Sequence, residues 1–342
     1  MSPSSLAKVI SMAIRNRRPL LIKGAPGIGK SDIVAQACNE AGAKLIIEHP
    51  VVSDPTDFKG LPFPSADGQS AHFLPFGSLL EILKYDDETK EKEREMIVYF
   101  IDDLGQAPPA VQAAAMQLIL ARRINGFKVS DKVVFIAATN RKADKAGVTG
   151  ILEPVKSRFA SIIELEVSVD DWISWAIDNK MPSELLAFIR FRGEKMLHDF
   201  HPTADIQNSP SPRTVANVGY LMRDGIPNEL RFEIFSGAAG EGWAGEFMGF
   251  LKLYENLPTI ESIIKDPDNA PIFSEPSLNF AVTSSLASKA NAQNFDTIMK
   301  YGKRMPKEFQ VLLVKDSVKH NRKVSDTKAF MDWALANSGV IL

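Results

Sequence analysis

One stretch decides the fold: residues 20–31 read Leu20-Leu21-Ile22-Lys23-Gly24-Ala25-Pro26-Gly27-Ile28-Gly29-Lys30-Ser31, and a helical pattern follows over Asp32–Ala41. Two glycines flank four residues and precede Lys-Ser, which is the pattern of a phosphate-binding loop between a strand and a helix. The glycines let the backbone curl so that its N–H groups and the helix N-terminus surround a polyphosphate. The sequence therefore predicts that Gly24, Ala25, Pro26, Gly27, Ile28, Gly29, Lys30 and Ser31 bind a nucleotide through its phosphates.

The last two residues of this loop have distinct expected roles. Lys30 supplies a point charge for the terminal phosphates, and Ser31 offers its hydroxyl to Mg²⁺. We expect Lys30 to face solvent in the empty loop, because its ammonium serves phosphate alone. A phosphate loop fits kinases, GTPases and motors equally, so a second site has to decide the chemistry.

An apolar run, Met96–Ile101, supplies that second site because it ends in two carboxylates, Asp102 and Asp103. Open α/β sheets place ligands at the carboxyl ends of their strands, which brings these acids toward the phosphates. Asp102 is suited to hold Mg²⁺ through water, and Asp103 is suited to polarise the attacking water. The acids and the phosphate loop together predict hydrolysis of the bound nucleotide.

Three further polar side chains follow in an order that suits phosphoryl transfer. Asn140 follows the apolar run Val133–Ala137. Alone it is typical of a strand-end turn, but after the acidic strand it is placed to reach the γ-phosphate and the water. Arg158 precedes the last strand and, in an oligomer, is a candidate to reach a neighbour's nucleotide, with Arg123 or Arg141 as the next candidate. Arg213 lies in the first turn of a helix capped by Ser211, where a cation opposes the helix dipole and suggests an anionic partner.

Around these motifs, the pattern predicts one α/β domain followed by helices. Residues 1–167 alternate short apolar runs with helical stretches, as a parallel sheet with crossover helices does. Apolar residues at helical spacing then predict a helical lid over 168–257 and a helical C-terminal extension over 275–342. Residues 51–75 are rich in Pro and Gly, which predicts a loop or hairpin insertion. The candidate strands are Leu20–Ile22, Lys44–Ile47, Met96–Ile101, Val133–Ala137 and Ile162–Val167.

The composition excludes several classes of protein. Hydrophobic residues make up 45% and charged residues 24%, which are ordinary globular values, and the net charge of -2 argues against an overall nucleic-acid or anionic-membrane binder. The single cysteine, Cys38, permits no internal disulfide and favours a reducing compartment. No run approaches the roughly 20 apolar residues that cross a bilayer, so we expect a cytoplasmic protein without membrane insertion.

The order of these motifs resembles that of the AAA+ ATPases, which are P-loop NTPases, and specifically of their MoxR-type branch. The resemblance to the branch rests on residues 102–112, with their acid pair, Ala-Pro-Pro and Val-Gln, and on residues 54–62, which look like the insertion into the second helix of that group. Two departures stand out. Asp103 stands where the group usually has Glu, and Leu104-Gly105-Gln106 stands where it commonly has an Asn-Arg pair.

The resemblance implies a role for each candidate residue. Residues 24–31 would be Walker A, Asp102 and Asp103 Walker B, Asn140 sensor 1, Arg158 the arginine finger and Arg213 sensor 2 on the lid. It implies ATP and Mg²⁺ as cofactors and a homo-oligomeric ring, typically a hexamer, with nucleotide between subunits. It also implies remodelling of a protein client, in many members with a von Willebrand factor A domain protein as partner.

Three functions compete on this sequence. The first is an ATP-hydrolysing ring motor or chaperone. The second is an ATP-gated assembly switch with little turnover, because the shorter Asp103 must move closer to reach the same water. The third is a DNA-acting motor, supported most by residues 300–328 with their nine Lys or Arg and three acidic residues. Few aromatic residues lie among these charges, which favours a solvated or protein-docking face over a nucleic-acid groove.

The insertion at 51–75 carries a further expectation about the client. Its prolines and glycines are expected to hold the aromatic residues on a loop, where they would face the axial pore or one ring surface and contact the client. The alternative is that the phenylalanines pack beneath the loop, as most aromatic residues do. The residues concerned are Phe58, Lys59, Phe63, Phe73 and Phe76.

Overall fold

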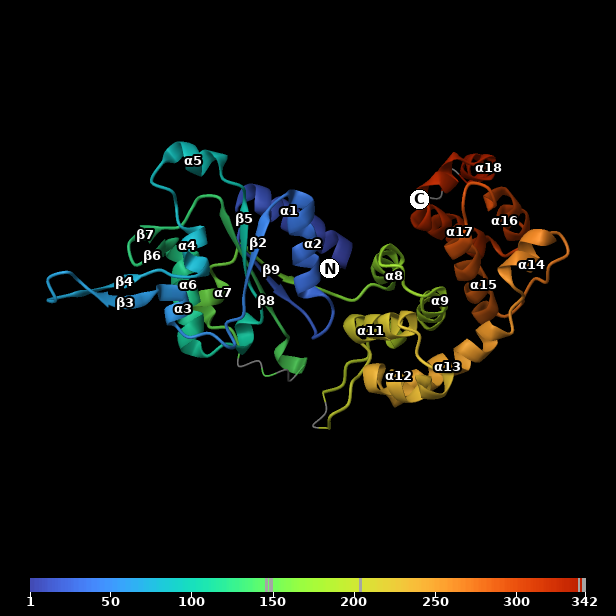
Figure 1. The fold of residues 1–342 in the computed structure, drawn as a ribbon, viewed down its shortest axis with the longest axis horizontal. Helices are drawn as coiled ribbons and strands as arrows, with labels where there is room; N and C mark the ends of the chain where they lie inside the picture. Colours follow the sequence, from blue (N-terminus) through green and yellow to red (C-terminus); the bar gives the residue numbers. More distant parts are fainter. Residues whose placement is uncertain (145–146, 148–149, 203–204, 338, 340–342) are drawn as a thin grey trace. The chain divides into compact units, whose positions relative to one another are not determined.

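The computed structural model describes residues 1–144, 147, 150–202, 205–337 and 339, and it forms two compact units. Unit 1 comprises Met1–Glu166 with Phe200–Pro202, and unit 2 comprises Val167–Asp199 and Thr203–Leu342. Each unit has a hydrophobic core of its own. The division follows the change from alternating strands and helices to helices alone (Figure 1).

A five-stranded parallel sheet forms the centre of unit 1, as the alternation of apolar runs and helical stretches predicts. Its strand order is β2-β5-β8-β1-β9, and every neighbouring pair is parallel. The prediction of an α/β P-loop sheet followed by helices is confirmed. The strands are β1 (Leu20–Lys23), β2 (Lys44–Glu48), β5 (Ile97–Ile101), β8 (Val133–Thr139) and β9 (Ser161–Glu164).

Helices cover both faces of this sheet, which explains its continuous apolar strands. All residues of β5 and β8 are buried, the pattern of strands covered on both sides. Figure 1 shows α1 and α2 on one side of the sheet and α4, α6 and α7 on the other. These helices are α1 (Pro3–Asn16), α2 (Lys30–Ala41), α4 (Ser78–Ile82), α6 (Pro109–Ala121) and α7 (Glu153–Lys156).

The insertion at 51–75 is a short helix followed by a hairpin. Helix α3 (Thr56–Lys59) precedes strands β3 (Leu61–Pro64) and β4 (Ala71–Leu74), which pair antiparallel. Gly60 lies between α3 and β3 and has a φ of 93°. A Cβ on Gly60 would lie 2.3 Å from the carbonyl oxygen of Leu74. This turn therefore requires glycine for its backbone angle and for its close approach.

The expectation that all phenylalanines of this region are exposed is wrong for Phe58. Its side chain is only 2% exposed and belongs to the core of unit 1, because α3 packs on α6 and turns the ring inward. Phe63, Phe73 and Phe76 are exposed, at 51%, 40% and 36%. The hairpin itself projects from the unit, as the blue strands of Figure 1 show.

The remaining elements of unit 1 are small. Helix α5 (Glu88–Glu93) lies in the charged stretch before β5, and Asp87 caps it by accepting hydrogen bonds from the backbone N–H groups of Thr89 and Lys90. A second hairpin joins β6 (Arg123–Ile124) to β7 (Phe127–Lys128). Two 3₁₀ helices follow strands of the sheet, η1 (Leu104–Gln106) after β5 and η2 (Lys142–Asp144) after β8.

Unit 2 is helical throughout its described elements. Its first part has an aromatic core in which Phe188 contacts Trp243 and Phe247 at centroid distances of 5.4 and 5.0 Å. The elements of this part are α8 (Val169–Asp178), α9 (Ser183–Arg192), α10 (Glu194–Leu197), α11 (Pro212–Arg223), η3 (Asn228–Leu230), α12 (Arg231–Ala239) and α13 (Glu241–Glu255).

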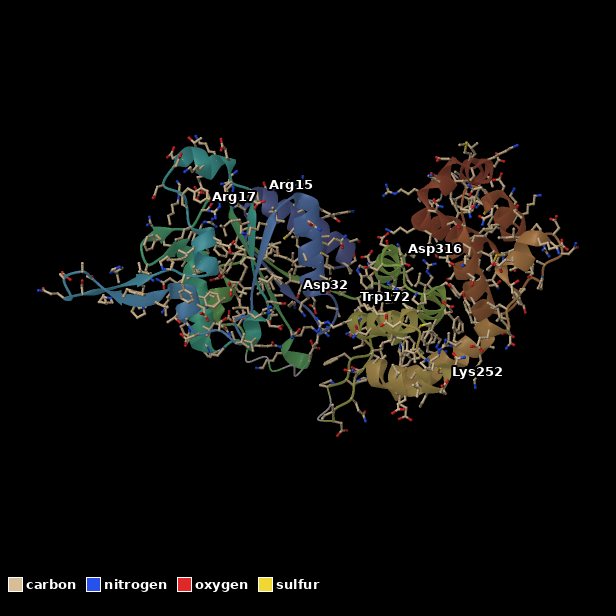
Figure 2. All side chains as sticks on the ribbon, in the orientation of Figure 1. Arg15, Arg17, Asp32, Trp172, Lys252 and Asp316 are labelled. Carbon is tan, nitrogen blue, oxygen red and sulfur yellow. The ribbon has the colours of Figure 1, made fainter. Side chains whose placement is uncertain are left out.

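The C-terminal helices pack directly on this first part. Helix α15 lies against α9 and α17. Arg190 of α9 forms a bidentate ion pair with the buried Asp316 of α17, and Figure 2 labels Asp316. A short helix, α14, lies between the predicted lid and the predicted C-terminal extension, and the side chain of Thr259 caps its N-terminus. The elements are α14 (Ile260–Lys265), α15 (Pro276–Lys289), α16 (Phe295–Gly302), α17 (Lys307–His320), η4 (Arg322–Asp326) and α18 (Lys328–Ala336). None of the helices in the described residues has the length and apolar character needed to cross a bilayer.

Candidate active site

The strand order brings the predicted polar residues to one edge of the sheet. Strand β8 pairs with β1 on one side and β5 on the other, so the three segments that follow these strands are neighbours. Those segments are the loop before Lys30, the acid pair Asp102 and Asp103, and Asn140. This edge is where open parallel sheets bind ligands.

The loop between β1 and α2 has the backbone shape that the glycines predict. Gly27 and Gly29 have φ values of 72° and 89°, a region that favours glycine. A Cβ on Gly24 would lie 2.6 Å from Cδ1 of Ile28 and 3.2 Å from the carbonyl oxygen of Leu165, so this position is closely packed. Gly29 is the N-cap of α2 and has no side chain to occupy the helix N-terminus. The first-turn N–H groups of α2 therefore suit an anion.

Lys30 is buried, so the expectation that it faces solvent is wrong. Its side chain is 7% exposed, and Nζ donates to the carbonyl oxygens of Gly24 at 3.1 Å and Ala25 at 2.9 Å. Nζ also donates to Oδ1 of Asn140 at 2.7 Å. An ammonium has three donors, and the curled loop with Asn140 meets them inside the fold.

Ser31 and Asp102 lie together, as a magnesium site requires. Ser31 Oγ donates to Asp102 Oδ2 at 2.6 Å, and Asp102 Oδ1 accepts from the backbone N–H of Asp103 at 3.0 Å. A hydroxyl and a carboxylate are oxygen donors of the kind that Mg²⁺ takes, so this pair fits the ion. In the described residues no cluster of three or more His, Cys, Asp or Glu forms a metal site, and Mg²⁺ would take its other ligands from phosphate and water.

Asp103 and Asn140 form the third contact of the edge. Asp103 has φ 55° and ψ 34°, a left-handed conformation that Asp tolerates better than most residues. Asn140 is buried, and its Nδ2 donates to Asp103 Oδ1 at 3.2 Å. Asn140 thus joins Lys30 to Asp103 through the two ends of one amide.

Arg158 lies between α7 and β9, and its side chain has no partner in the part of the chain that the structure describes. Its Nε is buried and forms no hydrogen bond there. A buried guanidinium nitrogen without a partner is costly, so a rotation of the side chain that brings the guanidinium to water or to an anion would be favourable. The contact of Arg158 with a neighbouring subunit's nucleotide stays a prediction.

Two other arginines, Arg141 beside this edge and Arg123 in the β6–β7 hairpin, are engaged within the chain. Arg141 donates through Nε and Nη2 to Asp144 at 3.1 and 3.0 Å, and these bonds raise its pKa. Arg123 donates to the carbonyl oxygen of Gly126 at 3.1 Å. Arg141 and Arg123 thus have partners within the chain, and a trans-acting role for any of the three arginines stays a prediction.

Arg213 has the local placement predicted for it. Ser211 and Thr214 form a capping box, Pro212 is in the first turn of α11, and Arg213 follows it as an exposed residue. Arg213 belongs to unit 2, and the phosphate loop belongs to unit 1. Its contact with nucleotide stays a prediction.

The sequence reasoning missed a set of ion pairs beside the loop. Glu164 of β9 pairs with Lys23 at 2.9 Å and with Arg141 at 3.7 Å, and the hydrogen bond from Lys23 is the main cause of its lowered pKa. The available signal was register, because Lys23 and Glu164 are partners at the ends of parallel strands. A contact between Gly105 and Thr139 was also missed, since nothing in the sequence marks it.

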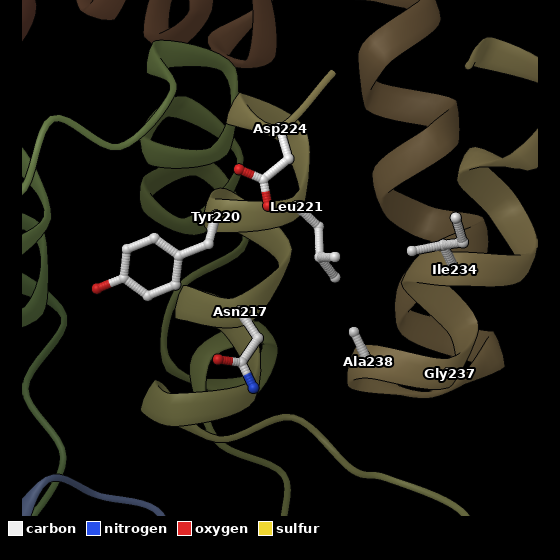
Figure 3. A pocket seen from close by; sticks show the side chains of 7 residues that line it. All are labelled: Asn217, Tyr220, Leu221, Asp224, Ile234, Gly237 and Ala238. Carbon is white, nitrogen blue, oxygen red and sulfur yellow. The ribbon is translucent and has the colours of Figure 1, made fainter. Parts of the chain in front are cut away.

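A groove on unit 2 offers no comparable chemistry. It has a volume of about 470 Å³ and lies between α11 and α12, where Figure 3 shows Leu221 on one side and Ile234 and Ala238 on the other. Asp224 is the one charged residue of its lining. A lining of this kind lacks the cations that phosphates need.

Known proteins agree with the assignment of unit 1. A family model, the ATPase family associated with various cellular activities (AAA), matches residues 20–167. This segment belongs to the AAA family. The AAA domain spans all five strands of the sheet and every predicted site residue except Arg213. It implies nucleotide binding, typically of ATP with Mg²⁺.

Solved structures resemble the chain only distantly. The Holliday junction branch migration motor RuvB of Thermotoga maritima is 15% identical over 87% of each chain, with a TM-score of 0.38. A point mutant of the same RuvB is 16% identical over 79% of this chain and 77% of that one, with a TM-score of 0.41. NtrX from Brucella abortus in complex with ADP is 12% identical over 98% of this chain and 68% of that one, with a TM-score of 0.41. A search of the curated proteins found no match.

Proposed function

We propose that this AAA protein hydrolyses ATP with Mg²⁺ in a homo-oligomeric ring, and that it remodels a protein client as MoxR-type ATPases do. One observation carries the proposal: two hydrogen-bonded pairs, Ser31 with Asp102 and Asn140 with Asp103, converge beside the buried ammonium of Lys30. Phosphoryl transfer needs a held metal, a cation on the phosphates and a group that orients water.

Each residue has one task in this reaction. Lys30 and the N–H groups at the start of α2 bind the β- and γ-phosphates. Ser31 and Asp102 hold Mg²⁺, which neutralises developing charge on the phosphates. Asp103 accepts a hydrogen bond from the attacking water, and Asn140 fixes the position of that carboxylate from 3.2 Å. The same Asn140 amide contacts Lys30, so it couples phosphate binding to the water-orienting group.

Arg158 completes the site from a neighbouring subunit in this proposal, and Arg213 contributes from the lid. Arg158 is proposed for the role in trans because its side chain is only half-buried and forms no ion pair with the described residues of its own chain. A planar guanidinium matches the geometry and charge of a transferring phosphoryl group better than an ammonium does. A closed ring, proposed to be a hexamer, provides such a neighbour at every site.

The second candidate function is an ATP-gated assembly switch with little turnover. Asp103 favours it in one respect, because its carboxylate is one methylene shorter than that of the Glu usual in the group. The contact with Asn140 supports hydrolysis instead, since it holds the short carboxylate in one orientation. We therefore retain slow but genuine hydrolysis as the main proposal.

The hairpin β3–β4 is the proposed contact with the client. Phe63 and Phe73 on the hairpin and Phe76 just after it are exposed, and an apolar surface on a projecting element suits an apolar polypeptide segment. The proposed partners are thus a protein client and, as in many MoxR-type proteins, a von Willebrand factor A domain protein. A nucleic-acid partner is disfavoured by the composition, and the proposed location is the cytoplasm.

ATP turnover at increasing protein concentration tests the central proposal. We expect a specific activity that rises with concentration, because an active site shared between subunits forms only on assembly. Lys30→Ala is expected to abolish turnover and ATP binding, and chelation of Mg²⁺ with EDTA is expected to abolish turnover. The matched control is Lys44→Ala. Lys44 is an exposed lysine at the start of strand β2, at the end of the sheet opposite to the phosphate loop, and it pairs with Glu81. Equal turnover by Lys30→Ala and the parent would contradict the phosphate-loop assignment.

A further inference from the structure

The turn that follows the acid pair is closely packed on the strand that ends next to Asn140. Gly105 is the middle residue of η1, and a Cβ built on it would lie 2.2 Å from Oγ1 and 3.3 Å from Cβ of Thr139. Real side chains do not approach this closely. Gly105 is not among the residues with positive φ, so its backbone angles do not demand glycine. At position 105 it is the space, and not the backbone angles, that restricts a side chain.

Thr139 has little freedom to move away from such a side chain. It is the last residue of β8 and is 6% exposed. Its Oγ1 donates to the carbonyl oxygen of Asn140 at 3.1 Å. A β-branched side chain in a strand has few rotamers, so a Cβ at position 105 would push η1 away from β8.

This contact sits between the two residues proposed to orient water. Asp103 directly precedes η1, and its carbonyl oxygen accepts from the N–H of Gln106 at 2.9 Å, so it moves with the turn. Asn140 directly follows Thr139. The 3.2 Å contact between Asn140 Nδ2 and Asp103 Oδ1 thus depends on how closely η1 lies on the end of β8.

We propose that Gly105 and Thr139 are positioning residues, whose direct contact sets the separation of Asp103 from Asn140 and thereby the rate of ATP hydrolysis. This inference rests on the proposed hydrolytic function and deepens it. The phosphate loop is joined to Thr139 by a backbone hydrogen bond, from Gly24 N–H to Thr139 O at 3.2 Å, which a change of the Thr139 side chain retains. Side-chain substitutions at this contact are therefore expected to affect turnover far more than ATP binding.

The test is a rescue by a second substitution. Gly105→Ala is expected to lower kcat about a hundredfold, the effect of a misplacement of about 1 Å, and to leave the Kd for ATP within about threefold. Gly105→Ala with Thr139→Ala removes the hydroxyl that the new methyl meets, so we expect kcat to recover at least about tenfold over Gly105→Ala. Recovery stays incomplete because Cβ of residue 139 remains close to the new methyl group.

A matched control separates the shape of Thr139 from its hydrogen bond. Gly105→Ala with Thr139→Val keeps a methyl group where the hydroxyl stands, so it should stay as slow as Gly105→Ala. Thr139→Val alone should keep kcat within about threefold of the parent, since it preserves the contact with Gly105. A purely structural role would lower the melting temperature of Gly105→Ala without this pattern of kcat.

Several outcomes overturn the inference. It fails if Gly105→Ala hydrolyses ATP at the parent kcat, or if the Ala and Val double variants recover equally. If Gly105→Ala does not fold, Thr139→Ala opens a gap in the same contact and is expected to lower kcat about threefold to tenfold with unchanged Kd, and an unchanged kcat overturns the inference.

Crystal structures of the variants keep this test separate from that of the proposed function. The distance from Asn140 Nδ2 to Asp103 Oδ1 should lengthen from 3.2 Å in Gly105→Ala and return in the double variant with Thr139→Ala. An unchanged distance overturns the inference. A parent that binds ATP and never hydrolyses it overturns the proposed function instead, while these distances still decide whether Gly105 positions Asp103.

Discussion

The carboxyl edge of the sheet and the β3–β4 hairpin are opposite kinds of surface within one unit. At the edge, polar groups are buried and bonded across three segments, with Lys30 and Asn140 as the clearest cases. On the hairpin, apolar groups such as Phe63 and Phe73 are exposed. Each arrangement costs free energy in the isolated subunit, since polar groups lose water on burial and apolar groups gain contact with it.

The difference predicts that the two proposed functions, ATP hydrolysis and client contact, are kept apart in unit 1. The edge holds its side chains in fixed positions through hydrogen bonds, as chemistry requires. The hairpin places rings on a projecting ribbon where they can meet a partner. Substitutions at the edge should therefore change turnover, and substitutions on the hairpin should leave basal turnover unchanged.

The largest effect is expected from Arg158→Ala. An arginine finger contributes about a thousandfold or more to turnover, so this variant should be almost inactive while it still binds ATP. Mixing it with Lys30→Ala subunits should restore activity, because junctions between the two combine an intact loop with an intact arginine. Turnover measured in titrated mixtures checks this.

The prediction for Arg158→Ala has a matched control and one outcome that would contradict it. Arg141→Ala serves as the control, because Arg141 is paired with Asp144 and the variant is expected to retain most of its turnover. Co-assembled mixtures without recovered activity would show that Arg158 does not act in trans, and Arg123 or Arg141 would be the next candidate.

The next effect is expected from Asp103→Asn. The amide cannot accept the proton of water as a carboxylate does, so turnover should fall about a hundredfold or more while Asp102 still holds Mg²⁺. ATP should then bind and persist, which single-turnover measurements detect. Asp103→Glu should raise turnover above the parent, because its carboxylate reaches one methylene further. If Asp103→Asn hydrolyses at the parent rate, the assembly switch becomes the better account.

Phe58→Ala is expected to act on stability and not on chemistry. Its ring is buried in the core of unit 1, and truncation of a buried Phe costs about 3–5 kcal/mol. Denaturant unfolding measured on the intact chain checks this value. A change below about 1 kcal/mol would indicate that the ring is not packed as described and would return Phe58 to the exposed class.

The smallest effect is expected from Phe63→Ala on the hairpin. The ring is about half exposed, so its removal should change the free energy of unfolding by no more than about 0.5 kcal/mol and leave basal turnover unchanged. Comparison with Phe58→Ala in the same assays sharpens the contrast between the buried and exposed aromatic residues of one insertion. A large loss of basal turnover in Phe63→Ala would mean that the hairpin and the carboxyl edge are not separate in function.

Much of the edge was predictable because its signals are local. The loop pattern at 24–31 requires glycines at fixed offsets, and the apolar run before Asp102 identifies a buried strand. The helix start at Ser211 was predictable for the same reason, since capping depends on three or four consecutive residues. Strand ends were less exact: β9 ends at Glu164, and the predicted strand ran to Val167.

The errors concern contacts between distant segments. Lys30 was expected in solvent, but Asn140 lies 110 positions further along the chain and accepts its hydrogen bond. Phe58 was expected on a loop, but α6 lies beneath α3 and buries the ring. Local patterns describe which conformation a segment prefers, and they do not state which other segment covers it.

The sequence by itself determined the class of the sheet, the phosphate loop, the acid pair and the order of the polar residues, because backbone conformation and ligand type depend on neighbouring residues. Only the tertiary structure decided that Asn140 bridges Lys30 and Asp103, that Arg158 Nε lacks a partner in the described chain while Arg141 has one, and that Gly105 lies against Thr139. These facts follow from the packing of parallel strands side by side. Contacts between segments far apart in the chain set the distances between these side chains to within a few tenths of an ångström.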